Sequence, residues 1–159
     1  MTAVPQIIPE LSFAFEARVD VAPPEHIGHA GSAMLGFTPI TGGTVSGPRL
    51  NGTVVAGGGD WAILREGVAV DLDARYLIRA DDGAVIDIVN RGFWVASDEV
   101  NARAEAGETI DPSEYYFRTQ PVFRTSAPQH TWLTHTVFVG MAYDDAELQQ
   151  IRIQFFEVK

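Results

Sequence analysis

Asp60 is the residue whose setting most suggests chemistry. It follows three consecutive glycines and precedes Trp61 in the stretch VVAGGGDWAIL (54–64). A phosphate-binding loop is disfavoured here, because such a loop needs a following helix or a lysine, and the one lysine of the chain is Lys159. Glycines within a strand pattern indicate a bulge that re-aims the next side chain. The stretch therefore predicts a kinked strand that aims Asp60, with a purely structural bulge as the alternative.

Further polar and aromatic side chains could complete an acid–base site. The candidate catalytic residues are Asp60, Arg75, Arg118, Tyr116 and His135. In this hypothesis the carboxyl is the general base or proton shuttle, the arginines stabilise an anionic or enolate-like substrate, and the tyrosine donates a hydrogen bond. The histidine is a second acid–base group, because histidine titrates near neutrality. Candidate substrate-binding residues are Trp61, Asp73, Tyr76, Phe117, Trp132 and Thr134.

Strand alternation divides this set between two faces. Asp73 and Arg75 share one face of their segment, and Tyr76 lies on the other. Tyr116 and Arg118 likewise share a face. If these polar faces line a cavity, they form a site. If they are solvated, which alternation alone favours, the same residues form cross-strand ion pairs worth about a few tenths of a kcal/mol.

Other kinds of site have little support. The chain has no cysteine, which removes thiolate metal sites and thiol nucleophiles. Its four histidines show no metal-ligand spacing, and no G-x-S-x-G motif is present. We therefore expect no metal and no cofactor.

The elements that must position these residues follow a period of two. Alternation predicts strands over 11–21, 68–79, 84–96, 115–125, 131–143 and 148–158, with weaker candidates at 33–46 and 50–58. Tight turns are expected at Asp82-Gly83 and at Glu66-Gly67. Only 97–108 has helical character, with Ser97 or Asp98 as its N-cap and Gly107 at its end. The pattern predicts an all-β fold: a closed or nearly closed antiparallel barrel of about eight to nine strands with one short helix.

Composition sets the broad class. The 159 residues are 46% hydrophobic and 20% charged, which predicts a single packed domain over 1–159. A formal charge of −10 argues against nucleic acid and against an anionic membrane surface. No apolar run reaches a membrane-spanning length and no signal segment opens the chain, so a cytoplasmic protein is expected.

Several motifs together resemble the domain-of-unknown-function family 3237. They are TPITGGTVSGPRLNGTVVAGGGDW (38–61), LDARYLIRADDGAVIDIVNRG (72–92), DPSEYYFRTQPVF (111–123) and WLTHTVFVGMA (132–142). The resemblance implies a small barrel, often dimeric, similar in fold to allene oxide cyclase and dirigent proteins, which work without a cofactor. The chain departs from the family where P-G-G-A-D-W is replaced by A-G-G-G-D-W (56–61), and where Thr134 and His135 replace an asparagine and a basic residue. These changes imply a specialised substrate or a lost activity.

Three functions follow as hypotheses. The first is a cofactor-independent lyase, isomerase or cyclase acting on a small, partly apolar, aromatic or carbonyl-bearing molecule inside the barrel. The second is a barrel that binds a small molecule without converting it. The third is a structural module with a filled interior. A homodimer is also expected, from the resemblance and from the apolar residues Ile151, Ile153 and Phe155 of the last predicted strand.

Overall fold

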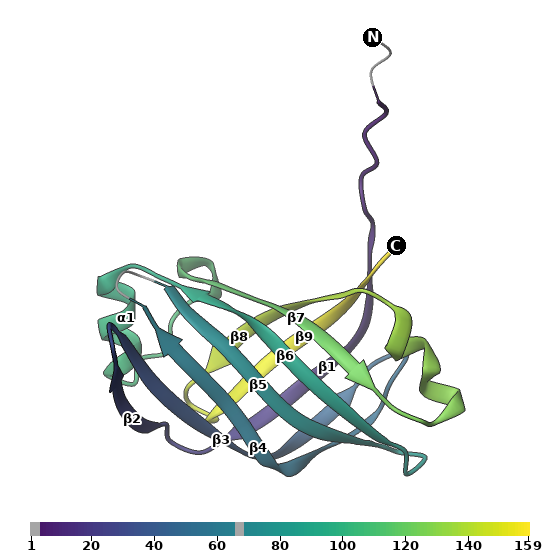
Figure 1. Cartoon of the computed structure of the whole chain (residues 1–159), viewed down its shortest axis with the longest axis horizontal. Helices are drawn as coiled ribbons and strands as arrows, with labels where there is room; N and C mark the ends of the chain where they lie inside the picture. Colours follow the sequence, from purple (N-terminus) through teal and green to yellow (C-terminus); the bar gives the residue numbers. More distant parts are fainter. Residues whose placement is uncertain (1–3, 66–68) are drawn as a thin grey trace.

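The computed structural model describes residues 4–65 and 69–159, and nine antiparallel strands in this part of the chain form one sheet that closes on itself (Figure 1). The strands are β1 (Leu11–Val21), β2 (Glu25–Ala30), β3 (Ala33–Ser46), β4 (Gly52–Leu64), β5 (Ala69–Ala80), β6 (Val85–Val95), β7 (Tyr116–Arg124), β8 (Phe138–Asp145) and β9 (Gln150–Val158). They lie in the order β1-β9-β8-β7-β6-β5-β4-β3-β2, and β1 also pairs with β3. That pairing closes an eight-stranded barrel and leaves β2 as an extra strand along β3. The predicted all-β barrel is confirmed.

Local signals located the helix and one hairpin. The helix α1 (Asp98–Glu105) begins after Ser97, whose hydroxyl accepts a hydrogen bond from the Val100 N–H, and Gly107 follows it with φ +82°. Gly83 has φ +89° in the turn between β5 and β6. Both predictions are confirmed. The predicted turn at Glu66-Gly67 lies outside the described residues.

Two segments differ from the sequence prediction. Residues 25–30, for which the sequence predicts no strand, form β2. The strand predicted over 131–143 begins only at Phe138, because residues 128–135 form the 3-10 helix η2 (Pro128–His135). Threonine hydroxyls explain the difference: Thr131 and Thr134 donate to backbone carbonyls three residues earlier, each at 2.8 Å. Such local bonds favour a turn over a strand ladder. A shorter 3-10 helix, η1 (Pro112–Glu114), precedes β7.

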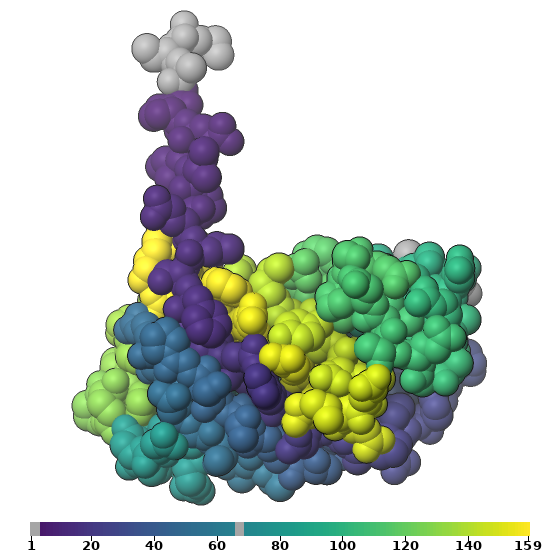
Figure 2. Space-filling model, turned by 180° about the vertical axis from the view of Figure 1, so that it is seen from behind, coloured from purple at the N-terminus to yellow at the C-terminus, as the bar shows by residue number. Residues whose placement is uncertain are grey.

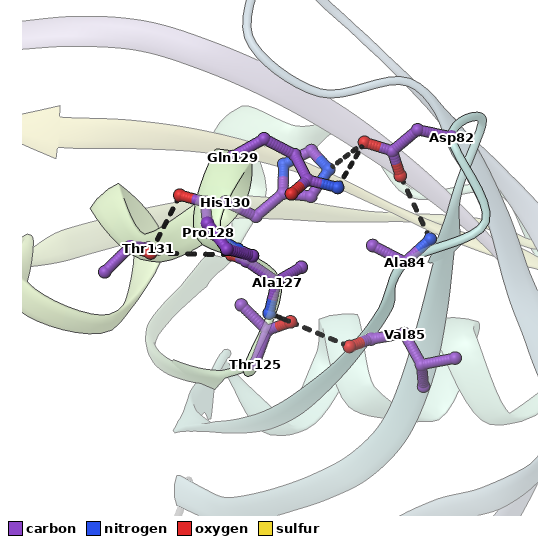
Figure 3. Close-up of polar contacts among 9 residues, drawn as sticks. All are labelled: Asp82, Ala84, Val85, Thr125, Ala127, Pro128, Gln129, His130 and Thr131. Atoms are coloured by element: carbon purple, nitrogen blue, oxygen red, sulfur yellow. Dashed lines mark hydrogen bonds and ion pairs between the residues drawn. The ribbon is translucent and has the colours of Figure 1, made fainter.

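The η2 helix is tied to the β5–β6 turn by one carboxylate (Figure 3). Asp82 Oδ2 accepts hydrogen bonds from Gln129 Nε2 at 3.1 Å and from His130 Nε2 at 2.8 Å. Asp82 Oδ1 accepts a third from the Ala84 N–H at 3.0 Å. The next η2 turn buries Leu133 in the core. The hairpin and the helix therefore close this end of the barrel together.

Large side chains fill the half of the barrel nearest η2. Phe123 packs edge-on against Phe15, Phe138 and Phe155, with ring centroids 5.1 to 5.8 Å apart. Ile153 is buried beside them, and Ile151 lines the interior nearer the other end. The apolar residues of β9 that suggested a dimer interface thus face into the barrel. They cannot form such an interface.

The two chain ends lie side by side. The segment before β1 extends away from the barrel next to the end of β9 (Figures 1 and 2), and the Lys159 N–H donates to the Glu10 carbonyl at 2.9 Å. In the described part of the chain, no helix has the length and apolar character needed to span a membrane.

Candidate functional site

The half of the barrel away from η2 contains a cavity of about 210 Å³ that is partly open to solvent. All eight barrel strands contribute to its lining, and half of the lining residues are aliphatic. Its polar lining residues are Thr38, Asp60, Tyr76, Asn90, Thr119 and Asp144. A barrel of about eight strands can be filled by side chains or can hold one small ligand. In this barrel, side chains fill the end nearest η2, and the other end contains a cavity large enough for a small ligand.

A glycine bulge in β4 aims Asp60 into this cavity. The pairing of β4 with β5 shifts between Val55 and Gly59, so three β4 residues face one β5 residue. Gly57 and Gly58 have φ +117° and +77°, and a Cβ at Gly58 would lie 2.2 Å from the carbonyl oxygen of Arg75. Only glycine allows this backbone approach. The predicted role of the triplet as a strand kink is confirmed, and Asp60 lines the barrel interior.

The environment of Asp60 favours its protonated form. Burial raises the pKa of this carboxyl from 3.8 to about 6, and the nearby charge of Asp73 acts in the same direction. The Asp73 N–H donates to Asp60 Oδ1 at 2.9 Å, which lowers the pKa and limits the rise. A carboxyl that titrates near pH 6 can both accept and donate a proton close to neutrality.

Three other residues of the lining each carry a buried polar atom without a hydrogen-bond partner among the described residues. The atoms are the Tyr76 hydroxyl oxygen, Asn90 Oδ1 and the Thr119 hydroxyl oxygen. Burial, together with the charge of Asp60, raises the pKa of the Tyr76 hydroxyl well above its usual value, so it is a neutral donor. Buried polar atoms are nearly always paired in folded proteins, so each exception needs an explanation. Three of the five such atoms in the described residues belong to the lining of this one cavity, where a rotation of each side chain would let it pair with a ligand.

The helix α1 positions an aromatic wall at the same end of the barrel. Trp94 Nε1 donates to Asn101 Oδ1 of α1 at 2.9 Å. The Trp94 ring stacks on Tyr115 with centroids 4.2 Å apart and meets Phe117 edge-on at 5.6 Å. Nearby, burial raises the pKa of Asp144, the second carboxyl of the lining. The site thus combines two carboxyls with aromatic and aliphatic walls.

The comparisons with known proteins agree with this fold. The model of a family described as "Protein of unknown function (DUF3237)" matches residues 9–158. The chain belongs to the DUF3237 family. The resemblance found in the sequence motifs is confirmed.

Among DUF3237 relatives, a UPF0311 protein of Rhodopseudomonas palustris is 33% identical over 138 residues, 87% of this chain and 90% of that protein. A solved structure of a Rhodopseudomonas palustris protein of unknown function has a TM-score of 0.89 and 31% identity, covering 97% of this chain and 99% of that one. A Clostridium acetobutylicum structure has a TM-score of 0.85 and 35% identity, covering 96% and 100%.

One relative of the DUF3237 chain carries an activity in its name. A hydroalkoxylation enzyme of Penicillium herquei is 32% identical over 80 residues, 49% of this chain and 52% of that protein. A solved structure of an enzyme from the same organism has a TM-score of 0.75 at 21% identity, covering 99% of this chain and 100% of that one, which shows a shared fold.

The DUF3237 barrel brings together three of the residues predicted for the site: Asp60, Tyr76 and Phe117. It does not bring the arginines to them. Arg75 pairs with Asp87 at 3.2 Å and is largely exposed. Arg118 lies over the exposed ring of Tyr116, 5.2 Å from its centroid. These three predicted residues lie on the outer face of the barrel, which is the solvated arrangement that alternation favoured.

The remaining predicted residues lie elsewhere on this DUF3237 chain. Trp61, Asp73, Thr134 and His135 line an outer groove of about 860 Å³. Trp132 is half-buried against Phe138 and below the Arg49 guanidinium, at the filled end. The groove is larger than the cavity, but both of its carboxylates are already paired: Asp73 with Arg91 at 3.1 Å and Asp71 with Arg65. We therefore take the barrel cavity as the site.

Sequence reasoning missed four polar residues of the cavity: Asn90, Thr119, Asp144 and Thr38. The first two interrupt the apolar faces of β6 and β7, at the positions after Ile88 and Phe117 on the same face. A polar residue within an otherwise buried face is the signal that could have found them. No group of three or more His, Asp or Glu side chains in the described residues could hold a metal ion.

Proposed function

We propose that this protein is a cofactor-independent lyase, isomerase or cyclase that acts on a small, partly apolar molecule in the barrel cavity. One observation carries the proposal. The Asp60 carboxyl, with a pKa of about 6, lies in an apolar cavity beside the partnerless Tyr76, Asn90 and Thr119 groups. Perturbed carboxyls in clefts are typical of acid–base sites.

The lining supports a division of roles. Asp60 Oδ1 is held by the Asp73 N–H, which leaves the other carboxylate oxygen to take a proton from the substrate. The hydroxyls of Tyr76 and Thr119 would donate to the oxygen on which negative charge develops, in place of the predicted arginines. Asp60 then returns the proton to a different atom. General base catalysis of this kind contributes roughly 10² to 10⁴ in rate.

The name of the Penicillium relative supports a reaction of this cofactor-independent class. Hydroalkoxylation adds an O–H group across a carbon–carbon double bond. One proton leaves oxygen, one proton joins carbon, and the new C–O bond balances the lost π bond. No electrons are gained or lost overall, so a single carboxyl that changes protonation state could serve both proton transfers.

A probe reaction tests the proposed base directly. 5-Nitrobenzisoxazole is a small neutral aromatic that opens to a coloured phenolate when a base removes one proton. We expect kcat/KM to rise with pH through about 6 and then level off, following the ionisation of Asp60. Asp60→Asn should lower kcat/KM by roughly 100-fold or more. The matched control is Asp87→Asn, which removes a carboxylate from the outer face.

Two results would decide against this function. A wild-type rate equal to that of Asp60→Asn would show that the carboxyl is not a competent base. Ligand binding in the cavity without any conversion would favour the small-molecule-binding barrel instead. The third hypothesis, a filled structural module, is disfavoured by the cavity beside Asp60.

A further inference from the structure

The charges around the cavity restrict what it can hold. None of the described residues in its lining is Arg, Lys or His, whereas two are carboxyls, Asp60 and Asp144. The two arginines that the sequence predicted for the site, Arg75 and Arg118, lie on the outer face of the barrel. The whole chain has a formal charge of −10. An anionic substrate would therefore meet like charge and no compensating cation.

The two carboxyls already respond to this environment. Burial raises the pKa of both Asp60 and Asp144, which means that the cavity disfavours negative charge on its own side chains. The same desolvation applies to a carboxylate or phosphate of a ligand. The expectation of an anionic substrate, which required arginines in the cavity, thus loses its physical basis.

The partnerless groups indicate what the ligand offers instead. Asn90 Oδ1 and the free oxygen of Asp60 accept hydrogen bonds, while the hydroxyls of Tyr76 and Thr119 both donate and accept. A ligand hydroxyl has the same double capacity: it can donate to a carboxylate or amide oxygen and accept from a hydroxyl. An ammonium group can also donate to these oxygens, but its charge must leave water to enter a mostly apolar cavity, and that desolvation opposes its binding.

Size and wall chemistry narrow the ligand further. The cavity volume is about 210 Å³. A cavity of about 150 Å³ holds benzene, so one ring or two fused rings match this space. The edge-on pair of Trp94 and Phe117 provides aromatic contacts, and Val70, Leu72 and Ile151 provide aliphatic ones.

We infer that the cavity selects uncharged molecules of one or two rings that carry a hydroxyl group, as phenols and alcohols do, and that it rejects anions. This inference rests on the proposed function only in using the same cavity. It names the substrate class, which the acid–base proposal leaves open.

Three probes with the same ring system test the inference: 2-naphthol, 2-naphthoate and 2-naphthylmethylammonium. Binding is measured by calorimetry at about pH 7, where the first is neutral and the others are charged. We expect 2-naphthol to bind at least about tenfold more tightly than either ion. Ala74→Leu, which fills the cavity, should abolish its binding and so locate the site.

Variants of Asp60 and Asp144 test whether these two carboxyls cause the weaker binding of the anion. Asp60→Asn combined with Asp144→Asn should narrow the difference between 2-naphthol and 2-naphthoate several-fold. Asp87→Asn combined with Asp81→Asn removes two carboxylates that are not in the cavity lining and should leave the difference unchanged.

The outcomes separate this inference from the proposed function. Equal or tighter binding of either ion, or no binding by 2-naphthol, would overturn the substrate class. The ring-opening assay judges the base independently, because its readout is proton transfer and not affinity. An active base with no preference for 2-naphthol would leave the function standing and remove this inference alone.

Discussion

At the scale of single residues, the buried carboxyl of Asp60 should cost the protein stability at neutral pH. Its pKa is about 6 in the fold against an ordinary 3.8, so the folded state binds more protons between these values. The free energy of unfolding contributed by this group therefore falls as pH rises from about 4 to about 6, and is constant above.

Asp60→Asn removes this dependence while keeping an oxygen for the Asp73 N–H. We expect the variant to be more stable than wild type at pH 7, by up to about 3 kcal/mol, with the difference shrinking towards pH 4. Urea denaturation at the two pH values measures it. A difference that does not change with pH would contradict the raised pKa.

The cavity residues could be predicted only in part, for a physical reason. Alternation showed that Tyr76 and Phe117 lie on apolar faces, and both line the cavity. Alternation does not tell which face of a strand points inward. Burying a guanidinium without a partner is costly, so the faces that carry Arg75 and Arg118 turn outward, where Arg75 pairs with Asp87.

At the scale of elements, the β4 bulge depends on Gly58. Its φ of +77° is close to the +82° of Gly107, but the space around the two residues differs. A Cβ at Gly58 would lie 2.2 Å from the Arg75 carbonyl oxygen, whereas a Cβ at Gly107 would have nothing within 4 Å. Alanine substitutions at Gly58 and Gly107 therefore distinguish the cost of the positive φ, which both positions share, from the cost of a steric clash, which only Gly58 has.

Gly58→Ala should lower the free energy of unfolding by about 3 kcal/mol or more, because both effects act there. Gly107→Ala is the control and should cost about 1 kcal/mol from the left-handed backbone alone. Chemical denaturation compares them. Equal losses would show that the close approach of β4 to β5 is not what requires glycine. The Gly58 variant should also lose activity in the ring-opening assay, since Asp60 follows the bulge.

The η2 helix depends on Asp82 in a similar way. Asp82→Ala removes the acceptor shared by Gln129, His130 and the Ala84 N–H. We expect amide hydrogen exchange in 128–135 to become at least about tenfold faster, with the barrel strands protected as before. Asp81→Ala changes the neighbouring exposed carboxylate and should leave η2 exchange unchanged. Faster exchange across the whole barrel would instead indicate a general loss of stability.

These long-range bonds also explain where element prediction failed. The barrel strands followed the period of two, and their bounds agree with the predicted ranges to within a few residues, except that β4 continues to Leu64 beyond its predicted end at 58 and η2 replaces part of a strand. The letters TWLTHTVF (131–138) alternate in the same way. Threonine hydroxyls bonded to nearby carbonyls, together with the contact to Asp82, make the first part helical. The contact between His130 and Asp82 joins residues 48 positions apart, and no local sequence pattern reveals it.

At the scale of the whole molecule, the barrel divides into a filled half and a cavity half. Phenylalanine rings and the closing helix η2 stabilise one end, and the other end keeps partnerless polar groups and a raised-pKa carboxyl. The packed core that stabilises the protein and the candidate site are thereby separated along the barrel axis. Sites that lower stability in this way are a common feature of enzymes.

The outer surface of the barrel carries an apolar patch on which two copies of the chain could associate. Exposed apolar side chains gather on the outer face of β4 to β7, including Trp61, Phe93 and Val122, each about half exposed. Patches of this kind mark interaction surfaces in soluble proteins. The nearby charges pair off, as Asp73 does with Arg91, so the patch is locally neutral on a chain of charge −10. We propose that a second copy of the chain covers this face.

Phe93→Glu tests the proposed dimer by placing a charge at the centre of the apolar patch. Light scattering at micromolar concentration should give a dimer mass for wild type and a monomer mass for this variant, because an unpaired buried carboxylate opposes association. Leu148→Glu, at an exposed leucine in the turn between β8 and β9, adds the same charge away from the patch and should remain dimeric. A monomeric wild type would reject the dimer. A dimeric Phe93→Glu variant would instead place the interface on another face of the barrel.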